Sequence, residues 1–270
     1  MNHQPRAVYT HGHHESVLRS HSWRSAQNSA AYLLGHLRPG IAVLDVGCGP
    51  GTITADIAER IAPGQVTAIE LKQEILDVAR TAAKARNLAN ITFVTSDVNA
   101  LDFPDDTFDV VHAHQVLQHV ADPVGALREM KRVCAPGGIV AARDADYAGF
   151  IWYPQLPGLD RWLQLYRQAA RRNGGEPDAG RRLLSWAQRA GFDDISPTGS
   201  IWCFATPEDR NWWGQTWAER VLRSDLARPL VDSGLATPVE LQDISATWRS
   251  WAHAPEGWMA IPHGEILCRV

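Results

Sequence analysis

The chain has 270 residues, of which 45% are hydrophobic and 21% are charged, and its formal net charge is −4. This balance excludes a chain that is disordered throughout, and the lack of a basic excess argues against a general nucleic-acid-binding protein. The tryptophans are distributed unevenly, because of the 11 in the chain only Trp23 precedes Trp152.

The sequence also carries information on compartment and metal binding. No run approaches the roughly 18 to 20 apolar residues of a membrane span, and the polar, histidine-rich N-terminus has no apolar signal segment. The four cysteines are scattered without C-x-x-C spacing, and the histidines within residues 11–14 have no further metal-ligand spacing around them. We therefore expect a cytoplasmic protein with reduced thiols, no membrane segment and no metal site.

The first half of the chain alternates apolar strands with amphipathic helices. Residues 23–37 predict a helix, and strands are predicted at residues 41–47, 65–70, 91–97, 108–114 and 138–146. Helices are predicted between these strands at residues 52–62, 73–88 and 122–134, the last with Asp122 as its N-cap. This alternation implies an α/β fold with a doubly wound, mostly parallel sheet that carries helices on both faces.

After residue 146 the pattern changes to aromatic segments interrupted by proline and glycine. Helices are predicted at residues 178–192, 207–225 and 238–253, and strands at residues 195–205 and 257–270. We divide the chain into an N-terminal helical lid (1–37), a ligand-binding core (38–146) and a third part (147–270). The third part is expected to supply helical caps over the carboxyl edge of the sheet, together with the last helix and strands that complete it.

The strongest single motif is the sequence DVGCGPG at residues 45–51, where a strand enters a glycine-rich turn that opens a helix. Glycine permits unusual backbone angles and close approach of a ligand, and the amides at the helix start attract an anionic group. The dinucleotide pattern G-x-G-x-x-G would require a glycine where Thr52 stands. The turn therefore suits a smaller ligand with an amino-acid end better than a pyrophosphate.

Two acidic residues follow the next two strands. Glu70 ends the strand at residues 65–70, where a carboxylate can accept hydrogen bonds from both hydroxyls of a ribose. Asp97 and Val98 follow the third strand, and a carboxylate beside an apolar side chain can hold the amino group and the ring face of an adenine.

Together with the sequence FDVV at residues 108–111 and the turn APGG at 135–138, these residues resemble the class I S-adenosylmethionine (SAM) dependent methyltransferase family over residues 40–145. A closer resemblance, to the ubiquinone/menaquinone biosynthesis C-methyltransferases, is carried by HQVLQH at 114–119 and YTHGHH at 9–14. The resemblance implies a Rossmann-like fold, SAM as cofactor and S-adenosylhomocysteine (SAH) as product. It also implies a cofactor site lined by Gly47, Gly49, Glu70, Leu71, Asp97, Val98 and His114.

Arg24 is our candidate for binding the methionine carboxylate, because a guanidinium can grip a carboxylate with two parallel hydrogen bonds. Methyl transfer itself needs mainly positioning, and it needs a base only where the acceptor loses a proton. His119, which follows the fourth strand, and Asp144 and Tyr147, near the end of the fifth, are the candidate bases. Of Asp144, Asp146 and Tyr147 we expect one to face the acceptor. The tryptophan-rich segments predict an apolar, aromatic acceptor pocket. Its expected residues are Tyr9, His14, Trp152, Tyr153, Trp202 and Trp213.

Within this branch the chain is also similar to bacterial natural-product methyltransferases that methylate indole C3 in cyclic dipeptides. That similarity implies a tryptophan-containing cyclic dipeptide as acceptor and a pyrroloindoline as product. The alternatives are O- or N-methylation of another aromatic metabolite, quinone-ring C-methylation, methylation of protein or RNA, and SAM binding without catalysis. We expect a small aromatic molecule as partner, no nucleic acid or membrane, and a monomer or homodimer.

Overall fold

The computed structural model describes residues 23–270, and its centre is a single mixed sheet of eight strands. Its first five strands are parallel: β1 (Ala42–Val46), β2 (Gln65–Glu70), β3 (Ile91–Thr95), β4 (Phe108–His114) and β5 (Cys134–Ala145). The strand order is β3-β2-β1-β4-β5-β8-β6, with β7 paired to β8. The order reverses direction between β1 and β4, which confirms the predicted doubly wound arrangement and places a ligand crevice at the carboxyl ends of these strands.

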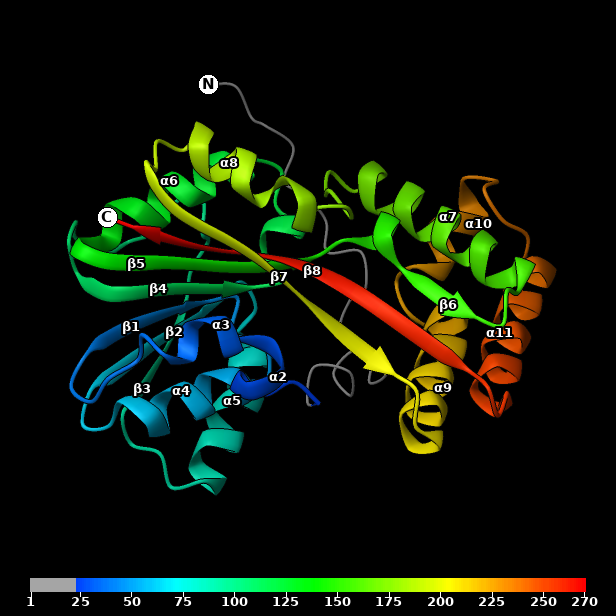
Figure 1. Cartoon of the computed structure of the whole chain (residues 1–270), viewed down its shortest axis with the longest axis horizontal. Helices are drawn as coiled ribbons and strands as arrows, with labels where there is room; N and C mark the ends of the chain where they lie inside the picture. Colours follow the sequence, from blue (N-terminus) through cyan, green and yellow to red (C-terminus); the bar gives the residue numbers. More distant parts are fainter. Residues whose placement is uncertain (1–22) are drawn as a thin grey trace.

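Helices cover both faces of the parallel strands (Figure 1). The helices are α4 (Thr52–Ile61), α5 (Gln73–Ala85) and α6 (Pro123–Val133), with the short α8 (Leu183–Arg189) beside α6. Successive residues of β1 serve opposite faces, because side chains alternate along a strand. Val43 belongs to one apolar cluster with Ile57 of α4, whereas Leu44 belongs to another with Leu127 of α6. Asp122 caps α6 as predicted, since its Oδ1 accepts a hydrogen bond from the Gly125 amide at 2.8 Å.

The segment predicted as one helix at residues 23–37 is two short helices instead. They are α2 (Ala26–Ser29) and α3 (Ala31–Leu34), separated by Ala30 at φ −139° and ψ 23°. The Asn28 carbonyl, which a continuous helix would pair with the amide four residues on, accepts a hydrogen bond from Trp202 Nε1 at 2.7 Å. A tertiary contact therefore replaces the helical hydrogen bond at this point.

The remaining strands are β6 (Ile151–Tyr153), β7 (Asp194–Phe204) and β8 (Trp258–Arg269). β8 is antiparallel to all its neighbours, and it pairs with β5 and then β6 along one edge and with β7 along the other. Figure 1 shows β7 and β8 running out of the parallel sheet into a second lobe of helices. That lobe contains α7 (Pro157–Arg172), α9 (Pro207–Arg223), α10 (Ala227–Asp232) and α11 (Pro238–His253).

Tryptophans form much of the core of this second lobe. Trp162 lies edge-on to Trp217 and Trp248, with ring centroids 4.5 and 4.8 Å apart, and all three side chains are almost fully buried. Trp251 is also fully buried and packs edge-on against Trp248. The uneven tryptophan distribution is thus explained in large part by the packing of α7, α9 and α11. No helix within residues 23–270 is long and apolar enough to cross a membrane.

Candidate active site

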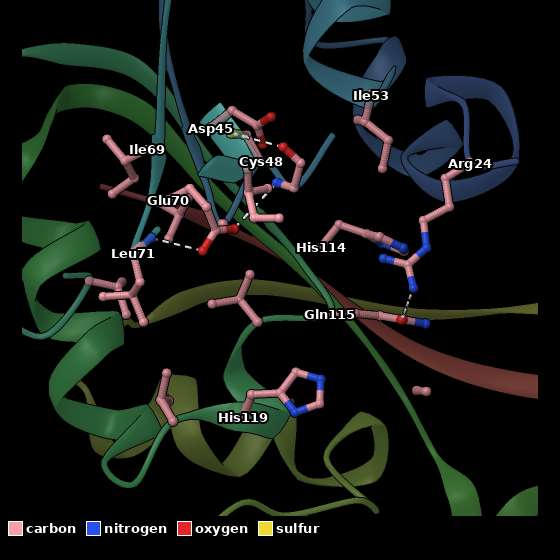
Figure 2. Close-up of a pocket in the computed structure, with 18 of the residues that line it drawn as sticks. Arg24, Asp45, Cys48, Ile53, Ile69, Glu70, Leu71, His114, Gln115 and His119 are labelled. Carbon is pink, nitrogen blue, oxygen red and sulfur yellow. Dashed lines mark hydrogen bonds between the residues drawn. The ribbon is translucent and has the colours of Figure 1, made fainter. Parts of the chain in front are cut away.

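A cavity of about 690 Å³ lies at the carboxyl ends of β1, β2 and β4 (Figure 2). We call the part lined by the loops after β1 to β4 the cofactor side, and the part lined by the second lobe and the residues after β5 the acceptor side. All eight predicted cofactor residues line this one cavity. They are Arg24, Gly47, Gly49, Glu70, Leu71, Asp97, Val98 and His114.

The glycine turn after β1 has a backbone that only glycine adopts readily. Gly47, Gly49 and Gly51 have φ values of 65°, 54° and 81°. A Cβ on Gly47 would lie 2.5 Å from Val116 Cγ2, so a side chain there would collide with the loop after β4. The absence of a side chain at Gly47 thus lets Val116 pack against one side of the turn, and the turn itself lines the cavity at the start of α4.

Glu70 is fixed beside this turn by two backbone amides. Its Oε1 accepts a hydrogen bond from the Leu71 amide at 2.8 Å, and its Oε2 accepts one from the Gly49 amide at 3.4 Å (Figure 2). Burial raises the pKa of Glu70 above its ordinary value, and the two amide hydrogen bonds partly oppose that shift. The carboxylate thus lies between the turn after β1 and the end of β2, where a ribose would lie in a site of this type.

A buried polar network joins the strand before the turn to its neighbours. Asp45 Oδ1 lies 2.8 Å from His112 Nδ1, and Asp45 Oδ2 accepts a hydrogen bond from Thr54 Oγ1 at 2.5 Å. The network ties β1, β4 and the first turn of α4 together. Sequence reasoning did not assign His112 or Thr54, because the contact depends on the parallel pairing of β1 with β4 across 67 positions.

His114, at the end of β4, presents its ring to the cavity. Burial, reinforced by the charges of Arg24 and Arg143, lowers the pKa of His114 well below its ordinary value. The imidazole is therefore neutral, with one N–H donor and one lone pair. Within residues 23–270 neither ring nitrogen has a hydrogen-bond partner, so this buried polar group is available to a ligand.

The three candidate bases occupy different environments. His119 lines the cavity, and burial lowers its pKa to about 3, while its Nε2 lies 2.9 Å from the Gln118 side-chain amide. Tyr147 also lines the cavity, stacked between Phe150 and Tyr166 with centroid distances of 4.5 and 4.1 Å.

Asp144, unlike Tyr147, does not line the cavity. This side chain is fully buried outside the cavity lining, and its Oδ1 accepts a hydrogen bond from the Gln118 backbone amide at 3.1 Å. Burial raises the pKa of Asp144 to about 7.

The predicted acceptor residues divide into three groups. Trp202 and Trp213 line the cavity, next to Phe150, Ile261 and Arg220, which sequence reasoning did not single out. Trp152 and Tyr153 do not line it, and the prediction that they do is wrong. Because β6 is extended, Trp152 is buried in the core of the second lobe, whereas Tyr153 faces the opposite side and is 56% exposed. Tyr9 and His14 lie outside the described residues.

The described residues fit SAM. Gly47 and Gly49 line the cavity, the Glu70 carboxylate is suited to the ribose hydroxyls, and His114 offers unpartnered polar atoms beside the turn. No group of three or more side chains suited to a metal ion occurs within residues 23–270. The fold and this site define a Rossmann-like, SAM-dependent methyltransferase.

Comparison with known proteins gives the family. Residues 37–177 match the family described as "Methyltransferase domain", and the chain belongs to it. The chain is 35% identical over 269 residues to an uncharacterized methyltransferase of Schizosaccharomyces pombe, covering 96% of this chain and 95% of that one. It is 30% identical over 280 residues to the probable methyltransferase ltbC of Aspergillus luteorubrus, covering 96% of both chains.

Other matches are partial or distant. A demethylmenaquinone methyltransferase of Listeria welshimeri is 35% identical over 134 residues, which cover 49% of this chain and 53% of that one. A structure of Haemonchus contortus phosphoethanolamine N-methyltransferase 2, in complex with phosphomonomethylethanolamine and SAH, superimposes with a TM-score of 0.58 at 19% identity. It covers 90% of this chain and 52% of that one, and at this identity it supports the fold alone.

Proposed function

We propose that the protein transfers a methyl group from SAM to a small, flat aromatic acceptor. The observation that carries this proposal is the continuity of the cavity, which joins the glycine turn to an aromatic acceptor side. Tyr147, Phe150, Trp202 and Trp213 supply four aromatic rings to that side. Aromatic walls favour flat rings, which stack on them or meet them edge-on.

On the cofactor side, the proposed roles follow the chemistry of each group. Glu70 accepts hydrogen bonds from the ribose hydroxyls, Asp97 and Val98 hold the adenine, and the glycine turn accommodates the methionine part. Arg24 binds the methionine carboxylate. Its guanidinium enters the cavity from the side opposite Glu70 (Figure 2), so the two residues would hold opposite ends of the cofactor.

The finer proposal is C-methylation of indole C3 in a tryptophan-containing cyclic dipeptide. SAM supplies a methyl group that its sulfonium charge activates. Indole C3 forms the new C–CH₃ bond with the electrons of the C2–C3 double bond, the S–CH₃ bond breaks, and SAH leaves. An amide nitrogen of the dipeptide then bonds to C2 and releases its proton to a base, which closes the pyrroloindoline ring. Each turnover moves one methyl group and releases one proton.

His119 is the base that the cavity lining supports best. Burial lowers its pKa to about 3, so the imidazole is neutral at pH 7 but only weakly basic. It can therefore take the proton only from a strongly acidic group, which the amide nitrogen becomes once it has bonded to C2. Burial raises the pKa of Tyr147, so its phenol keeps its proton and serves the acceptor as a hydrogen-bond donor instead.

Quinone-ring C-methylation is the second candidate, because the Listeria relative is named for demethylmenaquinone. A quinone ring is also flat and would fit between the same aromatic side chains. O- or N-methylation of another aromatic metabolite uses the same geometry with a different nucleophilic atom. A cytoplasmic location and a monomeric or homodimeric state stay predictions.

The test is turnover with trideuteromethyl-labelled SAM. A cyclic dipeptide containing tryptophan, a reduced naphthoquinone, a phenol and an aromatic amine are incubated separately, and mass spectrometry follows label transfer. Label on the dipeptide, with NMR signals of a quaternary C3 and loss of the indole absorbance, is the expected result. Label only on the naphthoquinone, oxygen or nitrogen would replace the indole proposal. SAH binding without label transfer to any of these compounds would contradict the aromatic-acceptor proposal.

A further inference from the structure

A chain of hydrogen bonds runs from Arg24 into the centre of the sheet. Arg24 Nη2 donates to Gln115 Oε1 at 2.6 Å, and Gln115 Nε2 lies 2.9 Å from His263 Nε2. His263 Nδ1 lies 3.0 Å from the Ile261 carbonyl oxygen. The three side chains are 91 and 148 positions apart in sequence, so only the folded chain brings them together.

The chemistry of the end groups fixes every donor and acceptor in this chain. A guanidinium can only donate, so the Gln115 atom that faces Arg24 must be the carbonyl oxygen. The amide nitrogen of Gln115 must then face His263, and because it too can only donate, His263 Nε2 must be unprotonated. The single ring proton of His263 is therefore on Nδ1, where it donates to the Ile261 carbonyl.

The surroundings of His263 agree with this assignment. The side chain is 3% exposed on β8, and its ring centroid lies 4.4 Å from that of Trp202. Burial, with the nearby charge of Arg143, lowers the pKa of His263 well below its ordinary value, so the ring is neutral and carries one proton, on either Nδ1 or Nε2. The Ile261 carbonyl favours the proton on Nδ1, because that nitrogen can then donate a hydrogen bond to it.

The backbone directs Gln115 toward β8. Gln115 has φ 53°, a left-handed conformation that is uncommon for a residue with a side chain, and its amide donates to the Arg143 carbonyl at 2.7 Å. The residue that follows β4 is thus held against β5 and oriented across the sheet. Its side chain can then bridge Arg24, from the segment before α2, to His263 on β8.

We propose that Gln115 and His263 are positioning residues, which orient the Arg24 guanidinium so that it binds the carboxylate of SAM. The proposal rests on the role proposed above for Arg24. A guanidinium that is already held at one nitrogen loses less conformational freedom when it binds a carboxylate, so holding Arg24 in place raises the affinity for the carboxylate of SAM. Neither Gln115 nor His263 needs to touch the carboxylate.

The test compares two ligands by calorimetry in the full-length protein: SAH, and decarboxylated SAH, which keeps the amine and lacks only the carboxylate. Gln115→Ala is expected to weaken SAH binding about tenfold, because it removes one hydrogen bond that orients Arg24. The dissociation constant of the decarboxylated compound should stay within about twofold of the parent value. Gln155→Ala is the matched control, because the Gln155 amide donates to the Trp152 carbonyl outside the cavity. Equal weakening of both ligands, or of neither, would overturn the proposal.

Two variants of His263 add an independent readout. In His263→Gln the new side-chain oxygen can still accept a hydrogen bond from Gln115, so the preference for SAH over decarboxylated SAH should be kept. In His263→Leu no acceptor is left, and the preference should fall as it does in Gln115→Ala. Equal preferences in the two variants would contradict the positioning role of His263. Arg24→Met tests the role of Arg24 separately from the roles of Gln115 and His263. If Arg24→Met keeps the preference for SAH over decarboxylated SAH, Arg24 does not bind the carboxylate. If Arg24→Met loses this preference and Gln115→Ala keeps it, Arg24 binds the carboxylate but Gln115 and His263 do not position it. None of these outcomes depends on the acceptor.

Discussion

Phe204 and Trp213 lie face to face, with ring centroids 4.5 Å apart and ring planes inclined by only 4°. Phe204 ends β7 and is fully buried, whereas Trp213 belongs to α9 and lines the cavity. The stack therefore fixes an acceptor-side residue to the central sheet. We therefore expect Phe204 to affect acceptor binding although it does not line the cavity itself.

Replacing Phe204 by leucine should loosen this part of the cavity without affecting the cofactor side. The Michaelis constant for the acceptor should rise several-fold, and the free energy of unfolding should fall by about 1 to 2 kcal/mol because the stacking is lost. Steady-state kinetics, SAH calorimetry and urea unfolding measure the three quantities. Phe192→Leu, in the buried cluster beside α8, is the control that should lose stability alone. An unchanged acceptor Michaelis constant in Phe204→Leu would show that Trp213 is held in place by other contacts.

Glu70→Ala should weaken SAH binding about 10- to 100-fold. The substitution removes a carboxylate that already accepts the Gly49 and Leu71 amides and that we assign to the ribose hydroxyls, and each hydrogen bond to a charged group contributes about 1.5 to 3 kcal/mol. Calorimetry with SAH measures the loss. Glu59→Ala, which removes an exposed partner of Arg86, serves as the control and should bind SAH normally. SAH affinity equal to that of the parent protein would exclude Glu70 from the cofactor site.

His119→Ala should lower the turnover number about 10² to 10⁴-fold, the usual range for loss of a general base, with SAH affinity little changed. The measurement uses the acceptor that the labelling experiment identifies. His36→Ala, at an exposed position, is the matched control. A turnover number that stays within threefold of the parent value would remove His119 from the catalytic step.

Asp144 should make stability depend on pH in a defined direction. Burial raises its folded pKa to about 7, above the ordinary 3.8, so the folded protein keeps this proton in a range where the unfolded chain has released it. The unfolded state then binds fewer protons, and the stability that Asp144 contributes falls as pH rises from about 4 to 7.

Asp144→Asn removes this titration. The melting temperature of the variant minus that of the parent protein should therefore increase between pH 5 and pH 8. The buried histidines titrate in both proteins, so their effects cancel in the difference. A difference that is constant over this range would show that Asp144 is ionised throughout.

The sequence by itself determined the parallel half of the fold and the cofactor side of the cavity. Strand and helix periods are local, and the carboxyl ends of parallel strands meet at one edge of the sheet, so Gly47, Glu70 and Asp97 could be brought together from their spacing alone. The sequence also predicted β7 and β8 as strands that complete the sheet, but it did not predict that β8 pairs with β5 and β6 along one edge and with β7 along the other.

Only the tertiary structure decided which side of an element each side chain faces. Trp202 and Trp213 line the cavity while Trp162 and Trp217 fill the core of the second lobe, although all four lie in similar tryptophan-rich segments. Asp144 sits beside the predicted site in sequence but is buried away from the cavity. The link from Arg24 through Gln115 to His263 joins three distant segments, and a left-handed backbone at Gln115 directs it. Such relationships depend on packing between elements, which no local period encodes.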